Sequence, residues 1–512
     1  MVKSDWHIKR PERGLILMSC KKSCNGQINL NRDLSWGSTS FKLLGINFDI
    51  DLDKILNLNY TDRYHQIKNL INTWSKRNLT VIGKISVVKT LILPILNHLF
   101  LTLPNPNAEM IKKINDAIYY FLWNSPVHRV KKEVLHMDYK NGGLKMINIH
   151  LFMIALKCTW IRKLFSSNCK WSTILFTNMD KEKLFKLGNS YTTNTISNVK
   201  NKFWIDVFKA WQYFVDKDIN STWEYFLASP LWMNKNININ NKHVFYRSWY
   251  NKGIVFVNDV ISNSGKFLSY GEIKDKFDIS GNIMMYNSII SALNKTKKLY
   301  SRGDNKLTEP LKKGTKDIYW MLIPKVVPNG EKKWNQILEL NELEWREIFK
   351  LPFAVTNNTK LQWLQFRVNH RILATNKFLC KINVINSQLC NFCKEEIETI
   401  EHVLWNCENV QNLLEEIDIW FLSNGISISF TKKNFLFGDV SHVYKGEISN
   451  MIFLCLKQYI YNTRYFQKVL SIHAVKKVLK DLYNLEKCIA VRNNKLESFN
   501  KLWILFTHLF QL

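Results

Sequence analysis

The sequence lacks the short motifs that mark several large enzyme classes. None of G-x-x-x-x-G-K-[ST], G-x-G-x-x-G or G-x-S-x-G occurs in its 512 residues. These motifs build phosphate-binding loops, dinucleotide sites and nucleophile elbows, in that order. Their absence leaves no sequence support for a P-loop nucleotide hydrolase, a Rossmann-type enzyme or an α/β-hydrolase.

A long uninterrupted apolar run is also missing. The most apolar stretch, residues 79–103, is broken by Lys84, Lys89, Pro94 and His98, so no window holds 18 clean apolar residues and we expect no membrane partner. The first residues, MVKSDWHIKRPERG, lack the apolar region of a secretory signal. The ten cysteines are therefore expected to be reduced thiols, with room for one metal site, and not a disulfide framework.

Acidic residues are scarce relative to basic ones. The chain has 72 Lys+Arg against 42 Asp+Glu, a formal net charge of +30, and residues 1–170 alone have 26 against 11. Such an excess is either solvated or neutralised by a partner, and nucleic-acid phosphates and an anionic membrane surface are the two obvious partners. Hydrophobic residues make up 46% of the chain, which excludes wholesale disorder, and the length predicts two to four domains.

The apolar pattern predicts a mainly α fold. Residues 15–19 and 41–48 are strand candidates. From Tyr60 apolar residues recur at helical spacing, and this helical pattern continues as far as Pro104. A further helix is expected to begin after the N-cap candidate Asn107, and another is expected over about 149–165. Residues 171–330 mix helical pieces with Asn-rich connectors, and residues 331–512 are expected to be mostly helical.

The sharpest local motif is Cys390-x2-Cys393-x8-His402-x4-Cys407. Thiolates and an imidazole at this spacing suit a tetrahedral zinc ion, and four protein ligands leave no open position, so the predicted role is structural. The alternative is four unrelated buried residues. Eight acidic residues lie around the motif between Glu395 and Asp418, so we expect a clip that holds neighbouring helices and not a phosphate-binding knuckle.

Two further patterns leave alternatives open. Residues 360–381 interleave Arg367, Arg371 and three lysines with Trp363 and Phe366, which suits phosphate contacts and base stacking. A core helix with a solvated basic face explains them equally well. Asp49, Asp51 and Asp53 alternate like a metal-binding carboxylate set, but solvent exposure at the end of a strand is the favoured interpretation.

Several segments together resemble a known family. WGSTSFKLLGINFDIDLDKI (36–55), NTWSKRNLTVIGKISVVKTLILPILNHLFLTLPNP (72–106), FLWN (121–124) and YKNGGLKMINIHLFMIALKCTWIRKLF (139–165) resemble the region after the catalytic core in reverse transcriptases of LINE-type (non-LTR) retrotransposons. LQWLQFRVNHRIL (361–373) with the Cys/His motif is similar to the zinc-binding C-terminal domain of the same polyproteins. The matching spans make up about a third of the chain.

This resemblance implies roles for particular residues. Phe41, Lys42, Leu43, Leu44, Gly45 and Ile46 would belong to the primer grip, which steadies the primer end. A helical thumb that holds the primer–template duplex through its backbone would follow. Its contact candidates are Trp74, Ser75, Lys76, Arg77, Asn78, Lys84 and Lys89. In the C-terminal region the candidates are Arg367 and Arg371, on the basic and aromatic pattern of residues 360–381 and not on the resemblance.

The resemblance stops short of catalysis. The family's polymerase binds two magnesium ions through palm aspartates, including an aromatic-x-Asp-Asp box, and no such box occurs in this sequence. Magnesium, the fingers, most of the palm and the endonuclease are thus expected to lie upstream of residue 1, as partner regions of one polyprotein. No catalytic residue is assigned.

The resulting expectation is a chain of four parts. They are a palm-edge and primer-grip remnant (1–50), a thumb-like helical bundle (51–170), a helical connector (171–330) and a zinc-clipped helical domain (331–512). The expected function is to hold the primer–template and RNA during target-primed reverse transcription. The expected partner is RNA, DNA or an RNA–DNA hybrid. The expected location is intracellular, in nucleus and cytoplasm for an active element. The alternative is a zinc-stabilised protein-interaction module without a nucleic-acid role.

Overall fold

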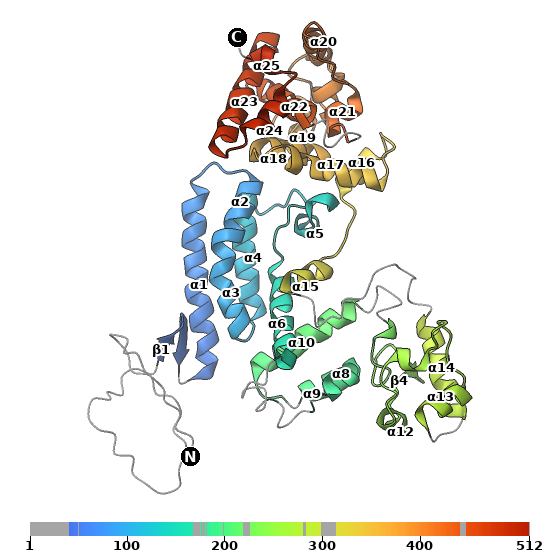
Figure 1. Ribbon diagram of the computed structural model, residues 1–512. Coiled ribbons are helices and arrows are strands. Elements are labelled where there is room, and N and C mark those ends of the chain that lie inside the picture. Colours follow the sequence, from blue (N-terminus) through green and yellow to red (C-terminus); the bar gives the residue numbers. More distant parts are fainter. Residues whose placement is uncertain are drawn as a thin grey trace, which may run out of the picture. The chain divides into compact units, whose positions relative to one another are not determined.

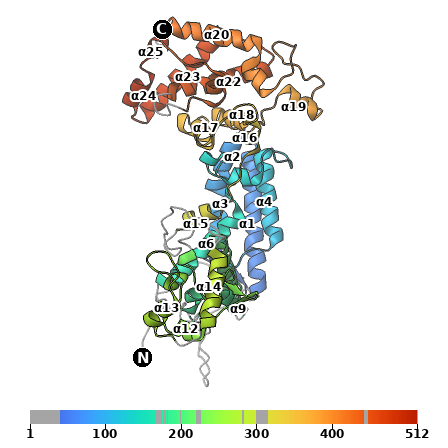
Figure 2. The ribbon, with the colours of Figure 1, turned by 90° about the vertical axis from the view of Figure 1, so that its right-hand side faces the viewer.

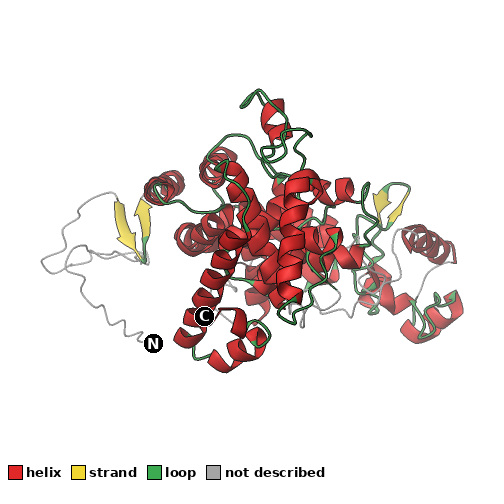
Figure 3. Cartoon of the chain, turned by 90° about the horizontal axis from the view of Figure 1, so that it is seen from above, coloured by secondary structure: helices red, strands yellow, loops and turns green. Residues whose placement is uncertain are grey.

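The computed structural model is mainly helical, as predicted, with two small antiparallel strand pairs (Figure 3). It describes residues 40–49, 51–166, 175, 180, 182–197, 199–218, 226–279, 283–297, 314–440 and 447–510. The strand candidate at 15–19 and most of the expected 1–50 remnant lie outside these residues.

The chain forms two compact units, where the sequence suggested four consecutive parts. The first unit takes in Met1–Asn72, Leu91–Asp116 and Ile149–Leu322, and the second takes in Thr73–Thr90, Ala117–Asn148 and Ile323–Leu512. The chain crosses between them inside α1 (Leu52–Ser75), inside the π-helix η1 (Val88–Ile92) and inside α4 (Ala108–Trp123). The expected thumb-like bundle is thus shared between the two units, and the expected connector belongs to the first as far as Leu322.

The other elements of the first unit are β1 (Ser40–Leu43), β2 (Ile46–Asp49), α3 (Leu93–Thr102), α6 (Ile149–Ser166), α8 (Lys183–Lys186), α9 (Asn189–Ile196), α10 (Lys202–Asp218), β3 (Asn238–Ile239), β4 (Lys242–His243), α12 (Arg247–Asn251), η3 (Val257–Val260), α13 (Tyr270–Phe277), α14 (Ile283–Lys297) and α15 (Thr315–Leu322). Its helical part is built on α6, against which α3, α10 and α15 pack (Figure 1). A separate core surrounds Trp232 and Trp249 and includes Leu293 of α14.

The first strand pair is a hairpin, whereas the sequence suggested one strand over 41–48. Leu44 (φ 49°) and Gly45 (φ 80°) both adopt left-handed backbone and reverse the chain, so that Phe41 pairs with Phe48. Two positive φ angles in a two-residue turn match the twist of antiparallel strands. Asn59 of α1 bonds both the N–H and the C=O of Asn47, and Arg63 donates to the carbonyl of Gly45 at 2.8 Å. These bonds fix the hairpin to α1.

A continuous helical run follows α1. It consists of α2 (Val81–Val87), η1 and α3, with Pro94 near the start of α3. Proline has no N–H for a helical hydrogen bond, and it is tolerated here because it lies in the first turn of α3. By length and composition alone, Val81–Thr102 is apolar enough to cross a membrane, a test that core helices of soluble proteins also pass.

The remaining elements of the second unit are α5 (Lys132–His136), η2 (Tyr139–Asn141), α16 (Asn329–Trp334), α17 (Glu342–Val355), α18 (Thr359–Asn369), α19 (Asn376–Lys381), η5 (His402–Asn406), α20 (Glu408–Leu422), α21 (Lys432–Phe437), α22 (Glu447–Tyr465), α23 (Ile472–Arg492), α24 (Leu496–Trp503) and α25 (Thr507–Phe510). Helix α22 contacts α17, α18, η5, α23 and α24, and one apolar core joins them (Figure 2).

The Asn141-Gly142-Gly143 turn packs tightly within the second unit. A Cβ on Gly143 would lie 1.9 Å from the carbonyl oxygen of Met137, so no other residue fits without moving the backbone. The preceding Tyr139 ring stacks on Phe353 of α17 at 3.8 Å, and Nε2 of His370 lies 2.8 Å from the carbonyl oxygen of Gly142. The turn is therefore a fixed joint between η2 and the helices α17 and α18.

Candidate metal centre

The four residues of the Cys/His motif converge on one point, as predicted. The ligand atoms of Cys390, Cys393, His402 and Cys407 all lie within 4.8 Å of one another. Sγ of Cys390 is 3.9 Å from Sγ of Cys407, and Sγ of Cys393 is 3.4 Å from Nε2 of His402. Cys390, His402 and Cys407 are buried. The cluster is thus a compact internal group and not four scattered residues.

A tight hairpin presents the first two cysteines. Leu389 and Ile397 form an antiparallel bridge, and Cys390 donates its N–H to the carbonyl of Glu396. Lys394, with φ 62°, turns the chain by donating to the carbonyl of Cys390 at 2.9 Å. The N–H of Phe392 points at Sγ of Cys390 from 3.4 Å. Such a loop directs both thiols to the same side.

A π-turn presents the other two ligands. Cys407 donates its N–H to the carbonyl of His402, five residues earlier. The spacing of five residues would place the two side chains on different faces of an α-helix, but one π-turn brings them onto one face. Cys407 then directly precedes α20. Its hydrogen bond with Cys390, and then the N–H groups of Val410 and Asn409, lower the pKa of its thiol.

The closeness of the Cys390 and Cys407 thiols explains why a cation suits this position. The hydrogen bond with Cys407, followed by burial, raises the pKa of the Cys390 thiol, and the same bond lowers the pKa of Cys407. Two thiolates this close together would repel each other, so a compensating positive charge would stabilise them. Tetrahedral ligands about 2.3 Å from one ion lie roughly 3.8 Å apart, close to the separations here. The residues fit a metal ion.

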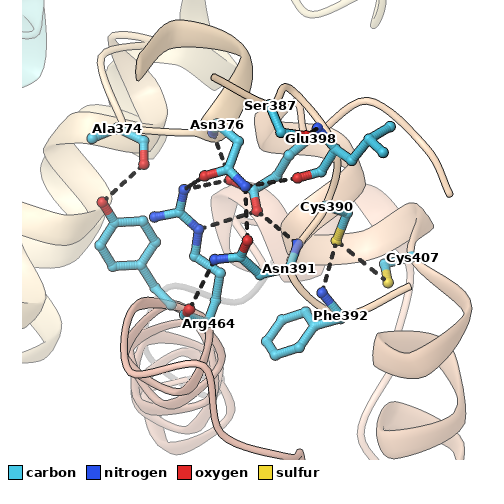
Figure 4. A network of polar contacts seen from close by, with 11 residues as sticks. Ala374, Asn376, Ser387, Cys390, Asn391, Phe392, Glu398, Cys407 and Arg464 are labelled. Atoms are coloured by element: carbon cyan, nitrogen blue, oxygen red, sulfur yellow. Dashed lines mark hydrogen bonds and ion pairs between the residues drawn. The ribbon is translucent and has the colours of Figure 1, made fainter. Parts of the chain in front are cut away.

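A buried polar network surrounds the hairpin (Figure 4). Arg464 of α22 forms a two-pronged ion pair with Glu398, at 2.6 Å and 3.1 Å, and both side chains are almost fully buried. Its guanidinium also donates to Asn376 of α19 at 2.6 Å. Asn391, inside the C-x2-C loop, accepts from Asn376 at 2.9 Å and donates to the carbonyl of Arg464 at 3.2 Å. The loop is therefore fastened to α19 and α22.

Two of the eight acidic residues around the motif are neutralised by arginines. Besides the Glu398–Arg464 pair, Glu401 accepts from Arg371 at 2.5 Å, and Oε2 of Glu396 lies 2.9 Å from Nδ1 of His402. Composition alone thus overstated the negative charge that this hairpin presents.

The structure of residues 360–381 supports the second interpretation given above, that of a core helix. Leu361, Leu364 and Val368 of α18 are buried, and Phe366 is buried between Trp363 and His370. The predicted contact residues are also engaged. The Arg371 guanidinium lies 4.2 Å from the centre of the Trp334 ring besides pairing with Glu401, and Arg367 lies over Tyr461 at 5.2 Å. Burial lowers the pKa of Arg367. Neither arginine is an open phosphate contact.

Lys84 is not a surface contact either, which corrects its predicted role. It is 6% exposed, and its ammonium donates to the carbonyl of Phe121 at 2.8 Å and to Oδ1 of Asn124 at 2.7 Å. These acceptors end helix α4, whose last carbonyls lack helical partners. Lys84 therefore caps α4 from inside the unit.

The other predicted contacts are more accessible. Lys76, Arg77, Ser75 and Asn78 are all exposed in the turn between α1 and α2, where the Arg77 guanidinium lies 4.9 Å from the centre of the half-buried Trp74 ring. Lys89 is partly buried. In the hairpin, Lys42 is exposed, Leu43 is partly buried and Leu44 at the tip is 83% exposed, while the side chain of Phe41 lies outside the described residues.

The aspartate alternation forms a local turn. Oδ1 of Asp49 accepts the N–H of Asp51 at 2.9 Å, and Asp51 pairs with Lys54 at 3.6 Å at the start of α1. Self-bonding of this kind is typical of aspartate in turns. It agrees with the solvent-exposure interpretation; the side chain of Asp53 lies outside the described residues.

Sequence reasoning missed the residues that surround the cluster. Asn376 and Arg464 lie 14 and 57 residues from the nearest ligand along the chain, and nothing in their local sequence links them to it. The seven described cysteines are all free thiols. No protein-family model matches this chain.

Proposed function

We propose that this chain is the nucleic-acid-binding C-terminal portion of a LINE-type reverse transcriptase, with a structural zinc ion at Cys390, Cys393, His402 and Cys407. In this proposal it holds primer–template and RNA during target-primed copying, and the catalytic palm, its magnesium and the endonuclease belong to other regions of the polyprotein. Its location would be that of the element's RNA, in cytoplasm and nucleus.

The observation that carries the nucleic-acid part is the charge of the thumb-like segments in the second unit. Residues 73–90 and 117–148 contain nine Lys+Arg and two Asp+Glu. Lys76, Arg77, Arg129, Lys131 and Lys140 are exposed. Most of these cations thus lie where a phosphate backbone can reach them, and backbone contacts need no base-specific geometry.

Lys89 lies near a second positive charge, that of Lys145. Burial, with the positive charge of Lys145 nearby, lowers the pKa of Lys89 to about 8. Two neighbouring ammonium groups repel each other, and a phosphate between them would relieve that repulsion. Among the residues that the structure describes, no ion pair with a carboxylate involves Lys89 or Lys145. The pair is therefore a suitable place for a backbone phosphate.

The zinc part rests on donor chemistry and spacing. Three thiols and one imidazole form a soft ligand set, and four protein ligands fill a tetrahedral ion. With every position taken by protein, such an ion supports the fold and activates no water. Its expected role is to hold the hairpin against α20 and, through the buried network, α19 and α22.

The test is the salt dependence of binding to an RNA–DNA hybrid duplex. Lys76→Gln with Arg77→Gln, and separately Lys89→Gln, should weaken binding of the full chain and reduce the slope of log K against log salt by roughly 0.9 per lost contact. Lys274→Gln with Lys276→Gln, an exposed pair on α13, is the matched control and should change neither. Salt-independent or absent hybrid binding by the wild-type chain would favour the protein-interaction alternative.

A further inference from the structure

Two exposed aromatic residues directly follow the buried arginine of the network. Tyr465 is 68% exposed and Phe466 is 63% exposed, and their rings contact each other edge to face at 5.1 Å. The ammonium of Lys468 lies 5.9 Å from the centre of the Phe466 ring. Large aromatic side chains that remain exposed in a fixed pair are unusual on a surface without a partner.

The backbone holds this pair in place. At the end of α22, Lys468 donates its N–H to the carbonyl of Thr463 and Gln467 donates to that of Arg464, while Gln467 adopts φ 52°. This pattern ends helices with a left-handed residue. Because the side chain of Arg464 is locked inward by Glu398 and Asn376, the next two residues are displayed from a rigid support.

A second basic and aromatic pair lies at the same network. Lys377 and Phe378 follow Asn376 directly in α19, and both side chains are exposed, Phe378 by 44%. Asn376 bonds Arg464, so the two chain segments meet there. The nearby carboxylates Glu398 and Glu401 are neutralised by arginines, which leaves this surface less acidic than the sequence around the Cys/His motif implies.

We propose that Tyr465, Phe466, Lys468, Lys377 and Phe378, called the aromatic surface, bind single-stranded nucleic acid by stacking its bases. Aromatic faces accept any base, and flanking lysines neutralise the phosphates between stacked bases. The inference rests on the proposed function, because it assigns the unpaired part of the nucleic acid to the C-terminal region and the duplex to the thumb-like segments.

The experiment compares probes with and without bases. A fluorescein-labelled 20-nucleotide oligo(U) RNA is titrated with the full chain, and so is a fully abasic oligonucleotide of equal length. Tyr465→Ala with Phe466→Ala should weaken oligo(U) binding by about fivefold or more, the lower limit for losing one stacked base. Binding of the abasic probe should not change. Tyr465→Trp with Phe466→Trp should retain oligo(U) binding.

Controls separate stacking from folding and from the duplex site. Ile504→Ala with Leu505→Ala removes two side chains of similar exposure, 69% and 63%, and should leave both affinities unchanged. Metal content and melting temperature of the Tyr465/Phe466 variants should match the wild type. Hybrid-duplex binding should keep its dependence on Lys89, so a failure of the proposed function appears in the duplex assay and a failure of this inference in the oligo(U) assay.

Two outcomes would overturn the inference. Unchanged oligo(U) affinity in the alanine variant means that the aromatic surface binds no bases. Unchanged affinity combined with loss of self-association in sedimentation velocity would assign the same surface to contact with another protein copy.

Discussion

The two units handle buried positive charge in the same way but differ in what else stabilises them. In the first unit, Lys157 is fully buried and its ammonium donates to the carbonyl of Leu103, just after the last residue of α3. In the second, Lys84 caps α4 and Lys457 donates to the carbonyl of Leu436 near the end of α21. Each of these lysines supplies a partner for a helix-end carbonyl that water cannot reach.

Among the described residues, only the second unit joins distant segments through a Cys/His cluster and a fully buried ion pair. The described part of the first unit has no counterpart of the Cys/His cluster, or of the buried Arg464–Glu398 pair. Its cores consist of apolar and aromatic side chains such as Trp232, Trp249 and Phe208. The difference indicates that the C-terminal hairpin, with little apolar surface of its own, depends on ligand bonds and ion pairs for its position.

The largest expected effect tests this dependence directly. Cys407→Ser should abolish stoichiometric metal binding and destabilise the second unit by several kcal/mol, because binding free energy at a structural zinc site of about 10–16 kcal/mol is coupled to local folding. Hydrogen–deuterium exchange should rise in η5, α20 and α19 and stay unchanged in α6 and α10. Metal analysis and exchange on the same sample provide the measurement.

Cys488→Ser serves as the control for the loss of a thiol, since Cys488 is exposed and lies outside the cluster. It should leave metal content and exchange unchanged. If Cys407→Ser removed the metal without raising exchange in the second unit, the ion would not be structural, and the contrast between the units would lose its main support.

A smaller effect is expected from the buried ion pair. Arg464→Met should cost about 3–5 kcal/mol in the second unit, because it leaves the Glu398 carboxylate unpaired in a fully buried position. Adding Glu398→Gln should recover part of this loss. Arg346→Met, which breaks an exposed pair with Glu342, should cost under about 1 kcal/mol. Urea unfolding followed by exchange in α22 measures all three variants, and equal costs for Arg464→Met and Arg346→Met would contradict the prediction.

Sequence reasoning found what is local and missed what is distant. The Cys/His ligands, the helix over 149–165 and the N-cap at Asn107, which accepts from Met110 at 2.8 Å, all depend on residues that lie at most 17 positions apart in the sequence. Lys84 is buried by α4, Arg367 by α22 and Arg371 by α16, which carries Trp334. No local sequence pattern reveals these distant partners. Charge counted along the chain therefore overestimated the cations available to a phosphate backbone.

The smallest expected effect comes from the buried lysines. They test the feature that both units share, a buried ammonium group at the end of a helix. Burial lowers the pKa of Lys157 and of Lys457 from 10.5 to about 7. Below pH 7 both the folded and the unfolded chain keep these groups protonated, so stability does not change with their titration. Between pH 7 and 10.5 the unfolded chain binds more protons, so each group should make stability rise with pH, by on the order of 1 kcal/mol per pH unit.

The two lysines lie in different units, so each unit has its own test. Lys457→Met should flatten the rise between pH 7 and 9 in the second unit and leave it in the first, while Lys157→Met should do the opposite. The methionine side chain is close to the lysine stem in size, so the comparison isolates the charge. The measurement is the urea midpoint of exchange in α22 and in α6 at each pH. A rise that persists in full in either variant would show that the ammonium remains protonated while buried, held by its carbonyl and the aromatic ring beside it, Phe203 for Lys157 and Phe435 for Lys457.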